Sequence, residues 1–127
     1  MAMRNTVLIV DDNVFVRHVL CELFKREPDF EVCGVAENGR EAIEEAGRLH
    51  PDLIVLDQSM PVMNGLDAAR ILKRMMPEVP LIMYSAFRDK VIEPQARLAG
   101  ISETVSKSDC VSVLIEKARR LVYRRVA

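Results

Sequence analysis

Residues 53–57 read Leu-Ile-Val-Leu-Asp, a short apolar run that ends on a carboxylate. Runs this short, rich in β-branched residues, are typical of strands that are buried on both faces. Similar runs recur along the chain at Val7–Val10, Val32–Ala36 and Val79–Tyr84, and a weaker one lies at Ile101–Val105. We therefore predict five buried strands.

Between these runs, apolar residues recur at helical spacing, which predicts helices over residues 16–24, 42–49, 66–76 and 111–122. A further helix is expected within residues 88–99, although Pro94 lies inside it. Because proline is tolerated only in the first turn, this helix should start late or be kinked. The alternation of strand and helix predicts a single α/β domain with a parallel sheet and helices on both of its faces.

The bulk composition excludes several function classes. The 127 residues carry 18 basic and 19 acidic side chains, and a net charge of −1 offers no electrostatic footprint for nucleic acid. We see no signal peptide and no apolar run long enough to span a membrane. The cysteines, Cys21, Cys33 and Cys110, have no metal-ligand spacing and indicate free thiols in a reducing compartment. We therefore expect a cytoplasmic protein.

Reactive side chains follow four of the five predicted strands. Asp11 and Asp12 follow the first strand, Asp57 the third, Ser85 the fourth and Lys107 the fifth. Any one of them alone would be read as a polar cap on a strand. Because ligands of open α/β sheets bind at the carboxyl ends of the strands, the whole set indicates a functional site at that edge.

The residue types define the chemistry of this edge. Three carboxylates that converge repel one another unless a hard cation shares them, and oxygen-only ligation suits Mg²⁺. The ammonium of Lys107 can neutralise charge on a transferring phosphoryl group, and the hydroxyl of Ser85 can donate to a phosphoryl oxygen. One carboxylate could then serve as the nucleophile.

Five segments, in order and at matching spacing, resemble the signatures of response regulator receiver domains. They are Val10-Asp-Asp-Asn13, Leu56-Asp57, Met60-Pro-Val-Met-Asn-Gly65, Tyr84-Ser-Ala86 and Lys107. The resemblance covers essentially the whole chain, residues 1–127, as a single receiver domain. It implies a doubly wound, flavodoxin-like fold with five helices and a five-stranded parallel sheet in the order 2-1-3-4-5.

The resemblance also assigns the metal site and the acceptor. Asp57 matches the phosphoacceptor and a metal ligand. Asp12 matches a direct Mg²⁺ ligand, and Asp11 matches the residue that acts mainly through water. Ser59 would supply its backbone carbonyl to the ion.

The implied activity is that of a switch rather than a turnover enzyme. Ser85 and Lys107 match the hydroxyl and the lysine that follow the phosphoryl group. The resemblance implies a sensor histidine kinase or phosphotransfer protein as donor, and a downstream protein or effector domain as the target. It also allows a homodimer on phosphorylation, and it implies no direct contact with nucleic acid or membrane.

The chain departs from the family pattern at several places. Thr104 stands where an aromatic side chain often couples to phosphorylation, and Ser108 stands where proline often follows the lysine. Phe87, two residues after Ser85, has two interpretations. It could exclude the hydrolytic water and slow self-dephosphorylation, or it could pack on the fourth helix.

Two alternatives from other classes remain open at this point. A haloacid-dehalogenase-type phosphatase also uses an aspartate nucleophile, but it would carry that residue on its first strand. A pseudo-receiver would be a binding module only, and it would usually lack one of the acidic, acceptor or lysine residues that are present in this chain.

Overall fold

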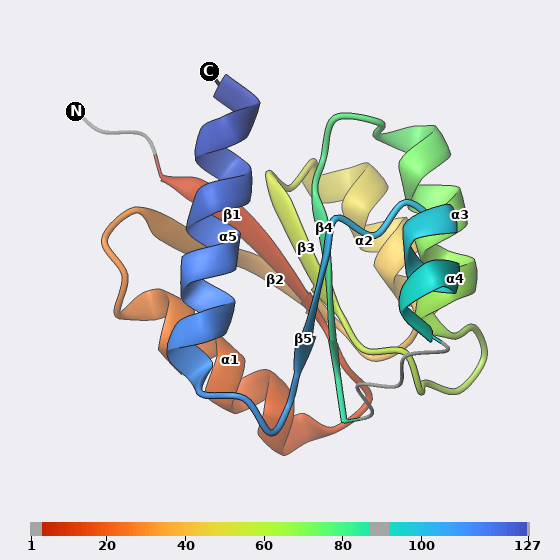
Figure 1. The fold of residues 1–127 in the computed structure, drawn as a ribbon, viewed down its shortest axis with the longest axis horizontal. Helices are drawn as coiled ribbons and strands as arrows, with labels where there is room; N and C mark the ends of the chain where they lie inside the picture. The colour runs from red at the N-terminus through yellow and green to blue at the C-terminus, as the bar shows by residue number, and fades with distance from the viewer. Residues whose placement is uncertain (1–3, 87–91, 127) are drawn as a thin grey trace.

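The computed structural model describes residues 4–86 and 92–126, in which strands and helices alternate along the chain (Figure 1). The elements are β1 (Asn5–Val10), α1 (Val14–Lys25), β2 (Phe30–Ala36), α2 (Gly39–Leu49), β3 (Leu53–Leu56), α3 (Gly65–Met75), β4 (Leu81–Ser85), α4 (Ile92–Leu98), β5 (Glu103–Ser106) and α5 (Val111–Val126). No helix among the described residues is both long enough and apolar enough to cross a membrane.

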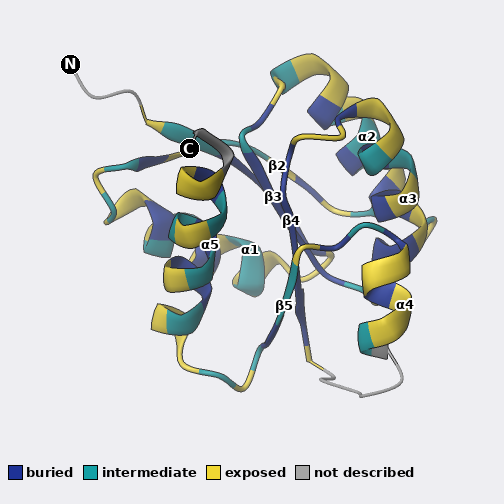
Figure 2. Cartoon of the chain, turned by 45° about the horizontal axis from the view of Figure 1, so that its top comes forward, coloured by how far each residue is buried: buried dark blue, intermediate teal, exposed yellow. Residues whose placement is uncertain are grey.

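The five strands form one parallel sheet in the order β2-β1-β3-β4-β5. Figure 1 shows α1 and α5 on one face and α2, α3 and α4 on the other. Successive strand residues point to opposite faces, so Val7 and Ile9 join the core under α1 and α5, whereas Leu8 and Val10 join the other core. The inner strands β3 and β4 and the second half of β1 are accordingly the most deeply buried part of the sheet (Figure 2). The predicted fold class and strand order are confirmed.

The predicted boundaries were wrong at four strands, and local hydrogen bonds explain two of the errors. Val79 belongs to the turn after α3, where its N–H donates to the carbonyl of Met76 at 3.1 Å, so β4 begins only at Leu81. The N–H of Ile101 donates back to Ala96 at 2.9 Å and closes the end of α4, so β5 starts at Glu103. The remaining errors are at β1 and β2, which both begin earlier than predicted because Asn5 and Phe30 already pair.

Pro94 is the third residue of α4, within its first turn, where the missing N–H costs no helical hydrogen bond. The described part of α4 therefore accommodates this proline. The predicted beginning at Arg88, and the interpretations of Phe87, lie outside the described residues.

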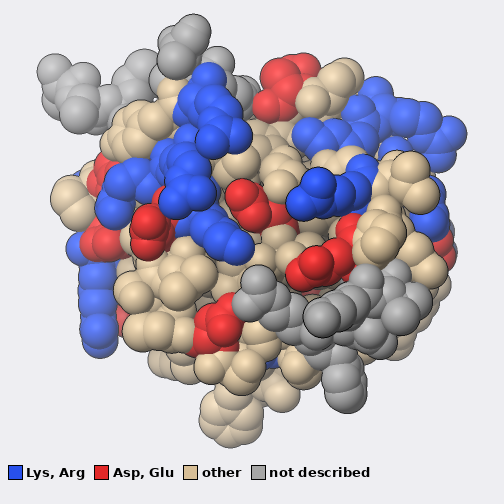
Figure 3. Space-filling view, viewed as in Figure 1, with Lys and Arg blue, Asp and Glu red and all other residues tan. Residues whose placement is uncertain are grey.

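A cluster of polar side chains fixes α5 against the turn between α1 and β2. The guanidinium of Arg119 donates to both oxygens of Asp29, at 2.9 and 3.0 Å, and the hydroxyl of Tyr123 donates to the same carboxylate at 3.0 Å. These contacts, led by the Arg119 hydrogen bonds, lower the pKa of Asp29 to about 2. The outer side of α5 is basic (Figure 3), and there Lys117 pairs with Glu103.

Two exposed histidines differ in backbone conformation. His50, at the C-cap of α2, has a φ of 50° in the left-handed region, whereas His18 lies inside α1. We expect His50→Gly to raise the free energy of unfolding by about 0.5–1 kcal/mol, because glycine relieves the Cβ clash. His18→Gly should lower it by about 1 kcal/mol, because glycine is unfavourable within a helix. Urea unfolding of both variants tests this, and a loss of stability in both would contradict it.

Candidate functional site

The candidate site lies at the carboxyl edge of the sheet, at the bottom of Figure 1. Asp11 and Asp57 directly follow the neighbouring strands β1 and β3, and each continues the strand pairing by one hydrogen bond. The N–H of Asp57 donates to Val10 at 3.0 Å, and that of Asp11 donates to Ala36 at 3.0 Å. Because the backbone is fixed on both sides, the two carboxylates are placed next to each other by the sheet itself.

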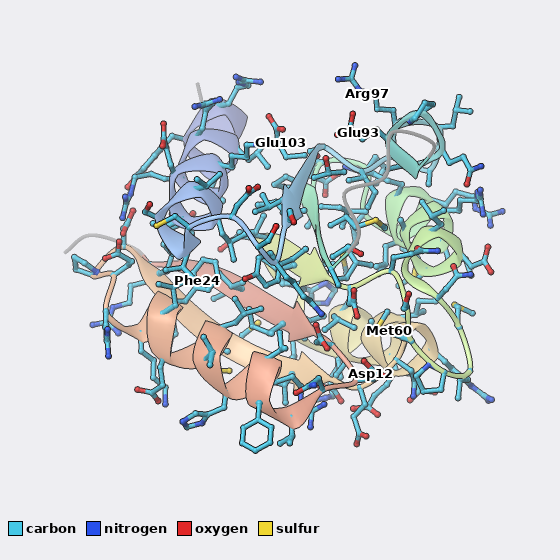
Figure 4. The ribbon with its side chains drawn as sticks, turned by 60° about the horizontal axis from the view of Figure 1, so that its bottom comes forward. Asp12, Phe24, Met60, Glu93, Arg97 and Glu103 are labelled. Atoms are coloured by element: carbon cyan, nitrogen blue, oxygen red, sulfur yellow. The ribbon has the colours of Figure 1, made fainter. Side chains whose placement is uncertain are left out.

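Asp11, Asp12 and Asp57 each bring a carboxylate oxygen within 4.8 Å of the others. Asp11 and Asp57 are buried, at 1% and 5% exposure, whereas Asp12 is exposed at the mouth of the pocket. Figure 4 shows Asp12 at the same end of the molecule as Met60 of the β3–α3 loop. A set of oxygen-only donors, partly open to water, fits Mg²⁺, which retains several waters when bound to protein.

Lys107 connects the two buried carboxylates. Its Nζ atom lies 2.8 Å from Oδ2 of Asp11 and 3.3 Å from Oδ2 of Asp57. Burial alone would lower the pKa of the lysine, but the hydrogen bonds and charges of the two carboxylates outweigh burial and raise it. Burial, and then the charge of Asp11, raise the pKa of Asp57 despite the opposing effect of Lys107. The pocket is therefore short of positive charge, which favours an added cation.

The residue after Asp57 anchors the start of α3. Gln58 accepts from the N–H of Gly65 through its backbone carbonyl, at 3.0 Å, and from the N–H of Leu66 through Oε1, at 2.8 Å. A Cβ atom at Gly65 would overlap the carbonyl of Asp57, so only glycine permits this approach. The sequence analysis missed the role of Gln58. Its side-chain amide, placed shortly before the Asn64-Gly65 turn, is the signal that could have indicated a contact with the start of α3.

The β3–α3 loop contains a strained turn. Val62 has a φ of 69°, and the N–H of Met63 donates across it to Pro61 at 2.7 Å. A β-branched residue rarely adopts this conformation, which costs on the order of 1–3 kcal/mol. The carbonyl of Met63 in turn accepts from the N–H of Gly39 at 3.0 Å, so the loop is held against the start of α2.

Ser85 and Lys107 lie side by side at the ends of β4 and β5. Ser85 is the last residue of β4 and is buried, and its carbonyl accepts from the N–H of Lys107 at 2.8 Å. Beyond Lys107 the turn is closed by side chains. The N–H of Ser108 donates to Oγ of Ser106 at 3.2 Å, and the N–H of Ser106 donates to Asp109 at 3.3 Å.

Thr104, at the position where an aromatic residue was expected, is half-buried. Its carbonyl accepts from Nζ of Lys117 at 3.2 Å. This part of β5 is therefore tied to α5 through the backbone, by a cation from the last helix, rather than through an aromatic side chain.

The comparison with known proteins identifies the family. Residues 7–119 match the response regulator receiver domain family. The response regulator domain of Thermotoga maritima CheB superposes with a TM-score of 0.89 at 31% identity, covering 94% of this chain and 97% of that one. A two-component response regulator of the LuxR family from Aurantimonas shares the fold at a TM-score of 0.91 and 24% identity, covering 96% of this chain and 87% of that one. The chain belongs to the receiver domain family, and it is a phosphorylation-dependent signalling switch.

Curated relatives point in a narrower direction. A protein-glutamate methylesterase/protein-glutamine glutaminase from Nocardioides is 39% identical over 125 residues, and the match covers 94% of this chain. One from Pyrococcus abyssi is 47% identical over 87 residues, covering 68% of the chain. The chain spans only 34% and 23% of the lengths of these two relatives.

Family membership favours the receiver interpretation over that of a haloacid-dehalogenase-type phosphatase.

Receiver domains bind Mg²⁺ at an acidic pocket, and we expect Asp12 to contribute most to that affinity here because its carboxylate is exposed at the mouth. Asp12→Ala should weaken Mg²⁺ binding by at least about tenfold, ~1.4 kcal/mol. Glu22→Ala, which removes an exposed carboxylate far along α1, serves as the control. Mg²⁺ titrations followed by amide NMR shifts measure both, and equal affinities of wild type and Asp12→Ala would refute the ligand role.

Proposed function

We propose that Asp57 is the phosphoacceptor of this switch, and that Ser85 and Lys107 bind the transferred group. The contact of Lys107 with both buried carboxylates is the observation that carries this assignment. Both oxygens of Asp11 already accept strong hydrogen bonds, from Lys107 and from the N–H of Asn13 at 2.9 Å. Oδ1 of Asp57 also accepts, from the N–H of Gln58 at 2.8 Å, but its lysine contact is the longer of the two. Asp57 also directly follows the central strand β3, which favours it as the nucleophile.

The carboxylates would hold Mg²⁺ together with a backbone carbonyl. Asp12 and Asp57 are assigned as direct ligands, Ser59 as the carbonyl ligand, and Asp11 as a ligand through water. Support comes from the clustered oxygens and from the excess of negative charge that Lys107 alone does not balance. When bound, the ion shields the negative charge of the incoming phosphoryl group from these carboxylates.

In the transfer step, a carboxylate oxygen of Asp57 attacks the phosphorus of a phosphohistidine. The new O–P bond forms as the P–N bond breaks, and the imidazole of the donor retains the electron pair of that bond. The ammonium of Lys107 then pairs with a phosphoryl oxygen, and the hydroxyl of Ser85 donates to another. The aspartyl phosphate carries a charge of about −2 in place of about −1 on the carboxylate, so the pocket gains about one negative charge.

The response is passed to the α4–β5–α5 face. The ends of β4 and β5 follow Ser85 and Lys107, and the affinity of that face for its target changes. To reverse a 1:99 equilibrium, phosphorylation must favour the active state by about 5.5 kcal/mol. We infer that residues 1–127 act as one receiver unit in the cytoplasm and control a protein-glutamate methylesterase-type output, as the names of the relatives suggest.

The donor would dock on the exposed apolar side of α1. Val14, Phe15 and Val19 are 60%, 78% and 54% exposed. A groove of about 200 Å³ beside them is lined by Phe15, Val19, Tyr84 and Lys107, so it runs from α1 to the site. A donor whose phosphohistidine reaches Asp57 must cover the groove beside α1. An apolar helical surface on the donor would match the exposed apolar side of α1.

Asp57→Asn should abolish labelling by acetyl phosphate and Mg²⁺ while the fold is retained, because the amide is nearly isosteric but is not a nucleophile. Asp52→Asn, at the opposite edge of the sheet, should be labelled like the wild type. Phosphate incorporation measured by mass spectrometry tests this. Full labelling of Asp57→Asn would refute the acceptor, and a wild type that is not labelled would favour the pseudo-receiver.

Phe15→Ala should slow phosphotransfer from a histidine kinase by about tenfold, because it removes a large exposed apolar contact worth over 1 kcal/mol. Labelling by acetyl phosphate, which needs no docking surface, should not change. Leu98→Ala, on exposed α4, is the matched control. The donor is whichever host kinase phosphorylates the wild type fastest, and an unchanged rate from it would remove α1 from the docking surface.

A further inference from the structure

Arg17 occupies an electrostatically unfavourable position in α1. Its N–H donates to Asn13 at 3.1 Å and closes the first turn of the helix, where the unpaired N–H groups carry partial positive charge. The first turn of α1 contains no acidic residue. A half-buried cation at this end of a helix therefore needs a compensating partner outside the helix.

The partner is the backbone of Asp11. Nη1 of Arg17 donates to the carbonyl oxygen of Asp11 at 2.7 Å, the short distance typical of a charge-assisted hydrogen bond. That carbonyl belongs to the peptide that joins Asp11 to Asp12. Arg17 thus holds the one peptide unit that separates the buried carboxylate of the site from the exposed one.

This contact completes the hydrogen bonding of Asp11. Its N–H donates to Ala36, Oδ1 accepts from the N–H of Asn13, Oδ2 contacts Lys107, and its carbonyl accepts from Arg17. The contact from Asn13 closes a turn around the Asp11–Asp12 peptide, and among the described residues Arg17 supplies the hydrogen bond to the carbonyl of that peptide. Figure 4 shows Asp12 projecting from this loop at the edge of the sheet.

We propose that Arg17 is a positioning residue which orients the Asp11–Asp12 peptide and so places the Asp12 carboxylate for Mg²⁺. The inference rests on the proposed metal site. It makes a prediction opposite in sign to that of simple electrostatics. Removing a nearby cation should by Coulomb's law strengthen the binding of another cation. Loss of positioning should instead weaken it.

The test compares Mg²⁺ affinity, measured by NMR titration, among wild type, Arg17→Ala and Arg40→Ala. Arg40 is an exposed cation in the first turn of α2 that pairs with Glu44. Arg17→Ala should bind Mg²⁺ about fivefold more weakly or worse, the effect of losing a hydrogen bond to a charged group. Arg40→Ala should bind equally well or slightly more tightly. Affinity equal to or above wild type in Arg17→Ala overturns the proposal.

Urea unfolding in EDTA accompanies each titration, because a merely structural role would lower stability and leave the Mg²⁺ affinity of the folded protein unchanged. If Arg17→Ala does not fold, Arg17→Gln, which keeps part of the stem and loses the guanidinium, decides by the same criterion. A wild type that binds no Mg²⁺ overturns the metal site and this proposal together. In another outcome, the wild type binds Mg²⁺ and is labelled on Asp57 while the Arg17 variants have the same Mg²⁺ affinity. That result overturns only the role of Arg17.

Discussion

A single ammonium shared between two buried carboxylates is the interaction on which the rest of this structure depends. Asp11 and Asp57 lie at the ends of adjacent strands, and Lys107 contacts both. Like charges at this separation repel, and a low-dielectric pocket strengthens the repulsion. One lysine cannot neutralise two buried carboxylates and the exposed Asp12. The fold therefore keeps a site with unbalanced charge, and such a site responds to a cation and to a phosphoryl group.

The surrounding backbone makes that imbalance sustainable. Gly65 allows α3 to approach the carbonyl of Asp57, and Gln58 ties the start of that helix to the acceptor. Val62 adopts a strained backbone conformation in the same loop. The hydrogen bond from the N–H of Gly39 to the carbonyl of Met63 holds the loop in this conformation. These are fixed costs of holding the carboxylates in place, and the two apolar cores on either side of the sheet offset them.

Much of the fold could be predicted because its signals are local. Runs such as residues 53–56 define a buried strand within a few positions, and helix-ending prolines separate the elements. The strand order came from the family resemblance, since periodicity does not determine which strands are neighbours. Boundaries failed where a neighbouring helix ended late, as at Ile101, which closes α4 instead of opening β5.

The residues that meet at this edge of the sheet could be named from the sequence, but their connections could not. Asp11, Asp57 and Lys107 each follow a strand, which a sequence reveals, but the lysine's preference for the shorter contact with Asp11 is a matter of three-dimensional distance. Arg17 and Gln58 were missed because each acts on a backbone carbonyl or N–H group. The contact of Arg119 with Asp29 joins residues 90 positions apart, so no local sequence pattern predicts it.

The hydrogen bond between the Lys107 N–H and the Ser85 carbonyl has a mechanical consequence. The two residues assigned to grip the phosphoryl group are neighbours on adjacent strands, and neither can be displaced along the sheet without pulling the other. Their responses are thereby synchronised. A pull on either side chain is therefore shared by two strand ends, so a phosphoryl group that engages one of them also acts on the other.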